Sequence, residues 1–361
     1  MKRTSEFVSL GHPDATCDYV VAYILDRYLE KDSRARFAME CQIKDNYVTL
    51  GGEVTSVAQF TEDNLRQFVR EAVREIGYTR EYALAWGTDN ALSADDLDIT
   101  IHTSMQSPQI AQGVNAEGWG DQGIMWGMAE SDMRTEMMPK DHYIARQIGT
   151  RLYDEARKGS FNIGLDIKTQ VTMDGDRVTD VIVAAPMRDE AERRNVETTV
   201  GSVVAAYAPE SGTDYTLVIN GTGAYVRHST MGDCGTTGRK LAVDFYGGNC
   251  RIGGGCPWGK DATKADVTLN VYARFLAQKM LERVGGSRVY CAISCCIGKS
   301  EIGITYLDEH LGEIASSVEN RPPSEIIDEL RLSQPTFAER KRFGLFSIQQ
   351  NAPCGQIRNV I

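Results

Sequence analysis

The sequence lacks any apolar run that approaches the ~20 residues needed to cross a bilayer. Its first residues, Met1-Lys2-Arg3, lead into a mixed polar segment and not into the apolar core of a signal peptide. We therefore expect a cytoplasmic protein with no membrane partner. A long basic stripe is also missing and the formal net charge is −11, so we expect no nucleic-acid partner and favour small-molecule chemistry.

The cysteines lack the spacing of a zinc knuckle or of a redox dithiol, and their number, nine, is odd. We therefore expect reduced and mostly buried thiols at Cys17, Cys41, Cys234, Cys250, Cys256, Cys291, Cys295, Cys296 and Cys354.

The chain of 361 residues is too long for one ordinary core, so two or three domains are expected. Apolar residues at helical spacing predict helices at Cys17–Glu30, Glu62–Ile76, Asp141–Lys158, Asp189–Tyr207 and Thr263–Val284. Runs rich in β-branched residues predict strands at Tyr47–Leu50, Ile99–Thr103, Thr169–Met173, Val178–Ala184, Thr216–Ile219, Leu241–Asp244 and Val289–Cys295. Strands followed by a long helix, several times over, favour α+β units with helices on one sheet face. No close repeat and no low-complexity linker marks a domain boundary.

Glycine turns and charged residues alternate between Met231 and Asp266, in the strings MGDCGTTGRK and FYGGNCRIGGGCPWGKDATKAD. Glycine lets a backbone approach an anion closely, because it adopts positive φ and adds no side-chain bulk. The interleaved cations would neutralise phosphate oxygens, and aspartates could hold the magnesium that accompanies a nucleotide. This stretch predicts a polyphosphate site.

The segment from Gly254 to Lys260 fits only the first part of a nucleoside-triphosphate loop, because Asp261 follows where that loop has serine or threonine. A different anion cradle that opens a helix at Thr263 is one interpretation. A plain glycine turn with solvated lysines is the other.

Three further motifs each have a functional and a structural interpretation. Gly11-His12-Pro13-Asp14 could place a hydrogen-bond donor beside a metal ligand, or could simply begin a helix. The run Gly118–Gly123 could be a turn around a ligand-facing aspartate, or only a tight bend. In Asp166-Ile167-Lys168 both charged side chains would share one strand face, which is usually a solvated face.

Taken together, these motifs resemble the methionine adenosyltransferase, or S-adenosylmethionine synthetase, family. The resemblance covers about Ser5 to Gly298 and is weaker over the last ~60 residues. It is carried, in family order, by SEFVSLGHPD, GGEVTS, GDQGIMWG, DIKTQVT, GDCGTTGRK and GGGCPWGKD.

The resemblance implies synthesis of S-adenosylmethionine from ATP and L-methionine, followed by hydrolysis of tripolyphosphate to pyrophosphate and phosphate. A thioether sulfur is already nucleophilic, so the difficulty is to expel a highly charged leaving group from C5′. Electrostatic stabilisation and in-line positioning should therefore dominate catalysis.

The resemblance also implies roles for individual residues. The catalytic and polyphosphate-binding set is His12, beside the ribose C5′ oxygen, with Lys168, Arg239, Lys240, Lys260 and Lys264. The adenosine set is Asp121, Asp166 and Tyr225, and Asp233 joins the ATP-binding residues. The methionine set is Glu53, Gln106, Asp233 and Lys264. Asp14 and Asp266 would each ligate one of two Mg²⁺ ions, Glu40 would bind K⁺, and Ile110 falls in a mobile gating loop.

Some positions depart from the family pattern. Ala15 stands where lysine is common, and Gln109 replaces an acidic residue in the gating loop. Val267 replaces an arginine, Tyr225 replaces a phenylalanine, and Arg227-His228-Ser229-Thr230 replaces a glycine-rich approach to GDCG.

The implied fold is α+β, with three similar sheet-and-helix subdomains around a pseudo-threefold axis: 1–98, 108–224 and 225–361, with segments intertwined in space. The implied assembly is a homodimer with shared active sites, and a dimer of dimers is an option. Two other hypotheses are a tripolyphosphatase or ATPase that lost methionine selectivity, prompted by Gln109 and Ala15, and a non-catalytic subunit that regulates an active homologue.

Overall fold

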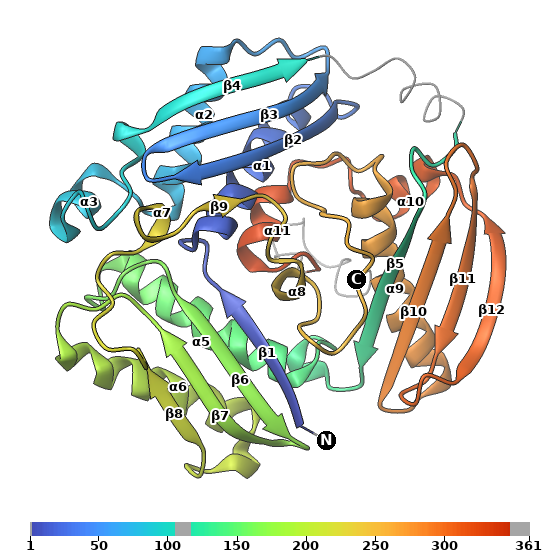
Figure 1. Ribbon diagram of the computed structural model, residues 1–361. Coiled ribbons are helices and arrows are strands. Elements are labelled where there is room, and N and C mark those ends of the chain that lie inside the picture. The colour runs from blue at the N-terminus through green and yellow to red at the C-terminus, as the bar shows by residue number, and fades with distance from the viewer. Residues whose placement is uncertain (1, 105–116, 347–361) are drawn as a thin grey trace, which may run out of the picture.

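Three four-stranded sheets surround a group of central helices in the computed structural model, which describes residues 2–104 and 117–346 (Figure 1). The first sheet has the order β4-β3-β2-β9, the second β1-β6-β7-β8, and the third β12-β11-β10-β5. The bounds of the strands are β1 Lys2–Val8, β2 Arg36–Lys44, β3 Tyr47–Thr55, β4 Asp98–Ser104, β5 Gly123–Glu130, β6 Lys168–Asp174, β7 Arg177–Ala184, β8 Thr216–Ile219, β9 Gly235–Thr236, β10 Arg288–Cys295, β11 Glu301–Leu307 and β12 Glu313–Asn320.

Each sheet is built around an antiparallel hairpin: β2–β3, β6–β7 and β10–β11. One flanking strand comes from an earlier or later third of the chain, since β9 joins β2, β1 joins β6, and β5 joins β10, all antiparallel. The other flank is β4 parallel to β3, β8 parallel to β7, or β12 antiparallel to β11. The fold is therefore α+β with three similar units that exchange one strand in a cycle.

The helices cover one face of each sheet. Their bounds are α1 Pro13–Leu29, α2 Glu62–Ile76, α3 Arg80–Trp86, α5 Lys140–Lys158, α6 Arg193–Tyr207, α7 Ser229–Gly232, α8 Leu241–Asp244, α9 Ala265–Val284, α10 Pro323–Glu329 and α11 Phe337–Phe343, with 3-10 turns η1 Ala94–Asp96, η2 Met133–Thr135, η3 Glu190–Glu192 and η4 Pro209–Ser211. Helix α5 packs on β1 and β6, and α9 packs on β5 and β10.

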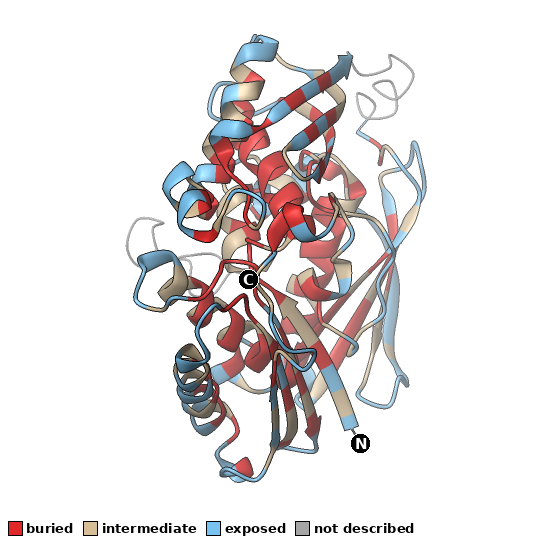
Figure 2. Ribbon diagram, turned by 60° about the vertical axis from the view of Figure 1, so that its left-hand side comes forward, coloured by how far each residue is buried: buried red, intermediate tan, exposed pale blue. Residues whose placement is uncertain are grey.

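Helix α1 lies at the centre of the molecule, where it contacts α2, α11, β2 and β9. All of its residues except Arg27 are buried. Burial on every side is typical of a core helix, and Figure 2 shows the buried positions gathered on the inner elements with exposed positions toward the outside.

Local sequence explains the helix limits. Thr61 and Asn64 form a capping box at the start of α2, and Gly77 ends it with φ 115°. The predicted helices at Glu62–Ile76 and Asp141–Lys158 agree with α2 and α5 to within one residue, and β8 agrees with its prediction. The predicted strands Thr169–Met173 and Val178–Ala184 lie in β6 and β7, which pair as an antiparallel hairpin.

The strand predicted at Leu241–Asp244 is wrong, because this segment forms the short helix α8. Its carbonyl and amide groups close helical turns, with the Asp244 amide donating to the Lys240 carbonyl at 2.9 Å. Strands β1, β2, β5, β9, β11 and β12 were not predicted, and Asp189 lies four residues before α6, with η3 between them.

The sheets also cross the predicted subdomain limits. Strand β1, from the predicted first subdomain, lies in the second sheet, and β5, from the predicted second, lies in the third sheet. The limits 1–98, 108–224 and 225–361 stay a prediction.

The eight described cysteines are all free thiols, and only Cys296 among them is exposed. Over residues 2–104 and 117–346, no helix combines the length and the apolar character that a bilayer span requires.

Candidate active site

The His-Pro-Asp turn and the GDCG segment lie directly against each other. A Cβ atom on Gly235 would come within 2.2 Å of the Pro13 carbonyl oxygen, so only glycine allows this approach. The contact places β9 at the N-terminal end of α1, beside Asp14. Two motifs more than 200 residues apart in sequence therefore form one site.

Asp14 is the anionic centre of this site and is 1% exposed. Its Oδ2 atom accepts a hydrogen bond from Lys240 Nζ at 2.6 Å, and its Oδ1 atom accepts one from the Thr236 amide at 2.9 Å. Arg239 Nε lies 3.6 Å from Oδ1. Burial raises the pKa of Asp14, but Lys240 and the Thr236 amide outweigh that effect and lower it overall, so the carboxylate is charged.

His12 is the N-cap of α1, and its Nδ1 atom accepts a hydrogen bond from the Asp14 amide at 3.1 Å. In the neutral ring the proton must then lie on Nε2. Burial, followed by the charges of Lys240 and Lys168, lowers the pKa of His12 to about 4. His12 is therefore a neutral Nε2–H donor at the edge of a cationic site, so it both begins the helix and offers a donor.

Asp166 lies just before β6 and is 7% exposed, so the interpretation of a solvated charged face is wrong for this residue. Its Oδ2 atom accepts hydrogen bonds from the Tyr225 hydroxyl and from the Ser229 amide, both at 2.9 Å. Burial raises the pKa of Asp166 to about 6, although those two donors oppose the rise. The site thus contains a carboxyl group that titrates close to neutral pH.

Lys168 and Asp233 complete this part of the site. Lys168 begins β6 and forms an ion pair with Glu6 at 2.7 Å. Both Lys168 and Asp233 act on the pKa of His12, which places them around its ring. We call these neighbours the His12 cluster: His12, Asp14, Asp166, Lys168, Tyr225, Asp233, Arg239 and Lys240.

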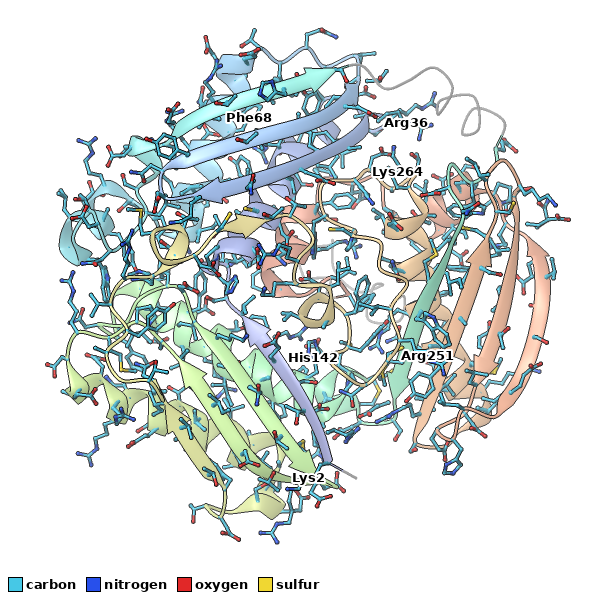
Figure 3. The ribbon with its side chains drawn as sticks, in the orientation of Figure 1. Lys2, Arg36, Phe68, His142, Arg251 and Lys264 are labelled. Atoms are coloured by element: carbon cyan, nitrogen blue, oxygen red, sulfur yellow. The ribbon has the colours of Figure 1, made fainter. Side chains whose placement is uncertain are left out.

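A second group of charges lies in the loop before α9. Lys260 forms an ion pair with Asp266, and Lys264 forms one with Asp261 at 3.0 Å. Asp261 is 2% exposed and also accepts a hydrogen bond from the Phe37 amide at 2.8 Å, with Arg36 at 3.8 Å. Figure 3 shows Arg36 and Lys264 close together near the junction of the first and third sheets.

The two lysines of this loop are 29% and 19% exposed and paired, so the interpretation of a plain turn with solvated lysines is wrong. A nucleoside-triphosphate loop is also excluded, because α9 begins only at Ala265 and Lys260 lies in a β-bridge with Ala38. Gly255 packs so closely on Asp266 that a Cβ atom there would lie 1.9 Å from its Oδ1 atom. The backbone thus encloses this carboxylate.

Glu53 lies in one row with Lys260 across the first sheet. Ala38 of β2 faces Lys260 on one side and Glu53 of β3 on the other. Residues in one row of a sheet point to the same face, so Glu53 and Lys260 lie two strand spacings apart, at about 10 Å. Glu40 is exposed on β2, opposite Gly51 and on the same face.

Asp121 and Asp266 both lie near Cys295 of β10. Burial first, and then the charges of Asp121 and Asp266, raise the pKa of Cys295 to about 11, and the Cys295 thiol lies 3.5 Å from the Asp121 carbonyl. We call this second group the Lys260 cluster: Glu53, Asp121, Lys260, Lys264 and Asp266. In the described part of the chain no hydrogen bond or ion pair joins it to the His12 cluster. Gln106, Gln109 and Ile110 lie outside the described residues.

Comparison with known proteins gives matches along most of the chain. Family models of S-adenosylmethionine synthetase match most of the chain in order: the N-terminal domain at residues 1–108, the central domain at 116–225 and the C-terminal domain at 228–354. The chain belongs to the S-adenosylmethionine synthetase family.

Individual relatives agree with this assignment. The chain is 34% identical to an S-adenosylmethionine synthase of Granulibacter bethesdensis, over 95% of this chain and 91% of that protein. It is 32% identical to one from Mesoplasma florum, over 95% and 94%. The solved structure of a Campylobacter jejuni S-adenosylmethionine synthetase matches it with a TM-score of 0.84 and 29% identity, over 95% and 94%.

Family membership implies a metal-dependent enzyme, so the two predicted magnesium ligands can be checked for fit. No group of three or more histidine, cysteine or acidic residues suited to a metal occurs in residues 2–104 and 117–346. Mg²⁺ is commonly held by one or two carboxylates together with substrate phosphates and water. Asp14 and Asp266 each offer one carboxylate that a lysine currently neutralises, which fits an ion that arrives with a nucleotide.

Sequence reasoning missed two carboxylates that shape this synthetase site. Asp261 connects the Lys260 loop to β2 through its hydrogen bond with the Phe37 amide. It also accepts a hydrogen bond from the Thr263 amide at 2.9 Å. An aspartate two residues before a threonine is a local turn signal, and this signal could have identified Asp261. Asp18 accepts a hydrogen bond from the Gly238 amide at 2.8 Å and so holds the segment before Arg239. No spacing rule connects residues that far apart.

Proposed function

We propose that this chain makes S-adenosylmethionine by in-line attack of the methionine sulfur on C5′ of ATP and then hydrolyses tripolyphosphate to pyrophosphate and phosphate. The family assignment supports the substrates, ATP and L-methionine. The His12 cluster supports the chemistry, because it gathers a neutral donor and the cations Arg239 and Lys240 around the buried carboxylate of Asp14, with Lys168 near His12.

His12 would donate its Nε2–H to the C5′ oxygen as negative charge develops there. A donor that is already held in place does not have to reorganise in the transition state, and the N-cap position fixes the ring of His12 while burial keeps it neutral. Lys168 and Arg239 would lie near the bonds that break, while Lys240, Lys260 and Lys264 would hold the polyphosphate. No general base is needed for the first step, because the thioether sulfur has a free lone pair.

Two Mg²⁺ ions per site would be held by Asp14 and Asp266. They would neutralise the part of the phosphate charge that the lysines do not neutralise. The lysines now paired with these aspartates would turn to phosphate oxygens when ATP binds. Glu40, exposed on β2, would bind K⁺. Asp166 and Tyr225 would contact the adenosine with Asp121, and Asp233, Glu53, Gln106 and Lys264 would contact methionine.

The separation of the two clusters supports a homodimer with shared sites, in which the His12 cluster of one protomer faces the Lys260 cluster of its partner. A dimer of dimers would keep the same arrangement. Analytical ultracentrifugation should give at least a dimer, and a purely monomeric active protein would contradict the shared site. A cytoplasmic location stays a prediction.

Purified protein with ATP, methionine, MgCl₂ and KCl should yield S-adenosylmethionine, pyrophosphate and phosphate. Absence of all three products across several pH values and temperatures would refute the proposal. Phosphate release that is equally fast without methionine would indicate a tripolyphosphatase or ATPase instead. Activity that appears only with an active homologue would indicate a regulatory subunit.

A further inference from the structure

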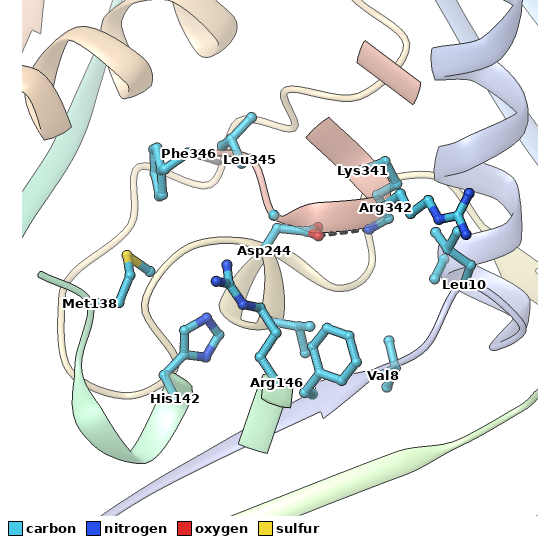
Figure 4. Close-up of a pocket in the computed structure, with 14 residues that line it drawn as sticks. Val8, Leu10, Met138, His142, Arg146, Asp244, Lys341, Arg342, Leu345 and Phe346 are labelled. Atoms are coloured by element: carbon cyan, nitrogen blue, oxygen red, sulfur yellow. Dashed lines mark hydrogen bonds and ion pairs between the residues drawn. The ribbon is translucent and has the colours of Figure 1, made fainter. Parts of the chain in front are cut away.

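A buried lysine from the C-terminal part of the chain lies behind both anion-binding loops. Lys341 on α11 is 4% exposed, and its Nζ atom donates to Asp18 at 2.9 Å and to Asp244 at 2.6 Å. Both carboxylates are almost completely buried as well. Figure 4 shows Asp244 and Lys341 in contact beside a small cavity whose lining also includes Leu10 and Arg342.

Each carboxylate holds one of the two loops. The second oxygen of Asp18 accepts a hydrogen bond from the Gly238 amide at 2.8 Å, directly before Arg239 and Lys240. The second oxygen of Asp244 accepts one from the Trp258 indole Nε1 at 2.8 Å, two residues before Lys260. The ammonium group of Lys341 also lies 4.9 Å from the centre of the Trp258 ring.

We infer that Lys341 is a positioning residue for polyphosphate binding: its ammonium group supports the loop of Arg239 and Lys240 and also the loop of Lys260 and Lys264, which in the proposed dimer belong to two different shared sites. It would touch neither the substrates nor the reacting atoms, since both of its hydrogen bonds end on buried carboxylates. This role goes beyond the proposed function and rests on it only because the two loops are proposed to bind polyphosphate.

The position of Lys341 is itself fixed independently of the site. Asp26 near the other end of α1 accepts hydrogen bonds from the amides of Phe337 and Ala338, both at 2.9 Å, and so anchors the start of α11. Helix α11 packs along α1, and Phe337 is buried against it. Lys341 therefore reaches Asp18 from a rigid helix, as a positioning residue should.

Removing the charge of Lys341 would leave two buried carboxylates facing each other. Burial already raises the pKa of Asp18 to about 7, Lys341 opposes that rise, and Asp244 adds to it. Without the lysine, mutual repulsion would loosen the two loops. A variant that removes one of the two negative charges separates this loss of stability from the loss of positioning.

The test compares wild type, Lys341→Met and Lys341→Met/Asp244→Asn by thermal melting and by calorimetric titration with tripolyphosphate and MgCl₂. Lys341→Met should melt at lower temperature and should weaken tripolyphosphate binding by about tenfold or more, as loss of a supporting contact behind a ligand typically does. The double variant should regain part of the melting temperature, because Asp18 no longer faces a second buried carboxylate, yet bind tripolyphosphate as weakly as the single variant.

Lys31→Met, at an exposed position before the first sheet, is the control and should match wild type in both measurements. A folded double variant with tripolyphosphate affinity within about twofold of wild type would overturn the inference, because a supporting contact changes affinity more than that. If Lys341→Met does not fold, the double variant decides alone. Failure of the wild type to make S-adenosylmethionine would refute the proposed function, whereas the tripolyphosphate titration would still report on Lys341.

Discussion

The buried carboxyl group of Asp166 allows a test of the site that needs no substrate. Its pKa of about 6 in the folded protein lies above the ordinary 3.8, because burial penalises the charged form. Unfolding then releases a proton between these pH values, and the charged carboxylate destabilises the folded state. The difference between 3.8 and about 6, at about 1.4 kcal/mol per pH unit, gives about 3 kcal/mol.

This cost is complete above pH 6, falls as the pH falls toward 3.8, and disappears below it. Asp166→Asn removes the charge, and its carbonyl oxygen can still accept from Tyr225 and Ser229, since both bonds end on the same oxygen. We expect the variant to be about 3 kcal/mol more stable than wild type at about pH 7.5 and nearly equal to it at about pH 4.

Urea denaturation of the ligand-free protein at a series of pH values measures this difference directly. Asp89→Asn, at an exposed position, should follow wild type throughout. Asp166→Ala should be about 2 kcal/mol less stable than Asp166→Asn at every pH, because two donors lose their acceptor. A constant difference between wild type and Asp166→Asn over the whole pH range would refute the assignment of a buried, neutral-prone carboxyl group.

Three further predictions concern catalysis. His12→Asn should slow S-adenosylmethionine formation by about 10²–10³-fold, as loss of a transition-state donor does, and should slow tripolyphosphate hydrolysis far less; rapid-quench kinetics showing equal losses would contradict this. Arg239→Leu should chiefly impair tripolyphosphate cleavage, so unchanged hydrolysis of added tripolyphosphate would remove Arg239 from that role. Tyr225→Phe should remove the hydrogen bond to Asp166 and lower the free energy of unfolding, measured by urea denaturation, by about 1 kcal/mol. The KM for ATP should change only slightly, because the aromatic ring remains. A large rise in KM would instead show that the hydroxyl group binds the nucleotide.

Local signals in the sequence were sufficient to predict the long helices. Thr61, Asn64 and Gly77 delimit α2 through side-chain caps and a left-handed residue, and these depend on neighbours only. The four residues Leu241–Asp244 begin with three apolar residues, as a short strand can, but the Lys240 carbonyl and the fixed loop around them favour a helical turn. Strand β9 has two residues and no pattern at all, and it exists because β2 offers it a free edge.

The site was predictable only in part for the same reason. Glycines and cations in GDCGTTGRK identify an anion site, since the chemistry lies in one segment. Pairings such as Asp14 with Lys240, 226 positions apart, or Asp18 with Lys341, 323 positions apart, follow from packing of distant elements. The surroundings of Ala15, which departs from the family pattern, also depend on distant elements, because Ala15 and Lys341 line the same cavity.

The cyclic exchange of strands among the three sheets has a consequence for synthesis on the ribosome. The first sheet cannot close until Gly235 and Thr236 have emerged, although its hairpin is complete by Thr55. Strand β1 is made first and must wait for β6, and β5 must wait for β10. The open edge of β2 and the unpaired strands β1 and β5 are therefore exposed while later segments are synthesised, so we expect chaperone cover during elongation to be important for this chain.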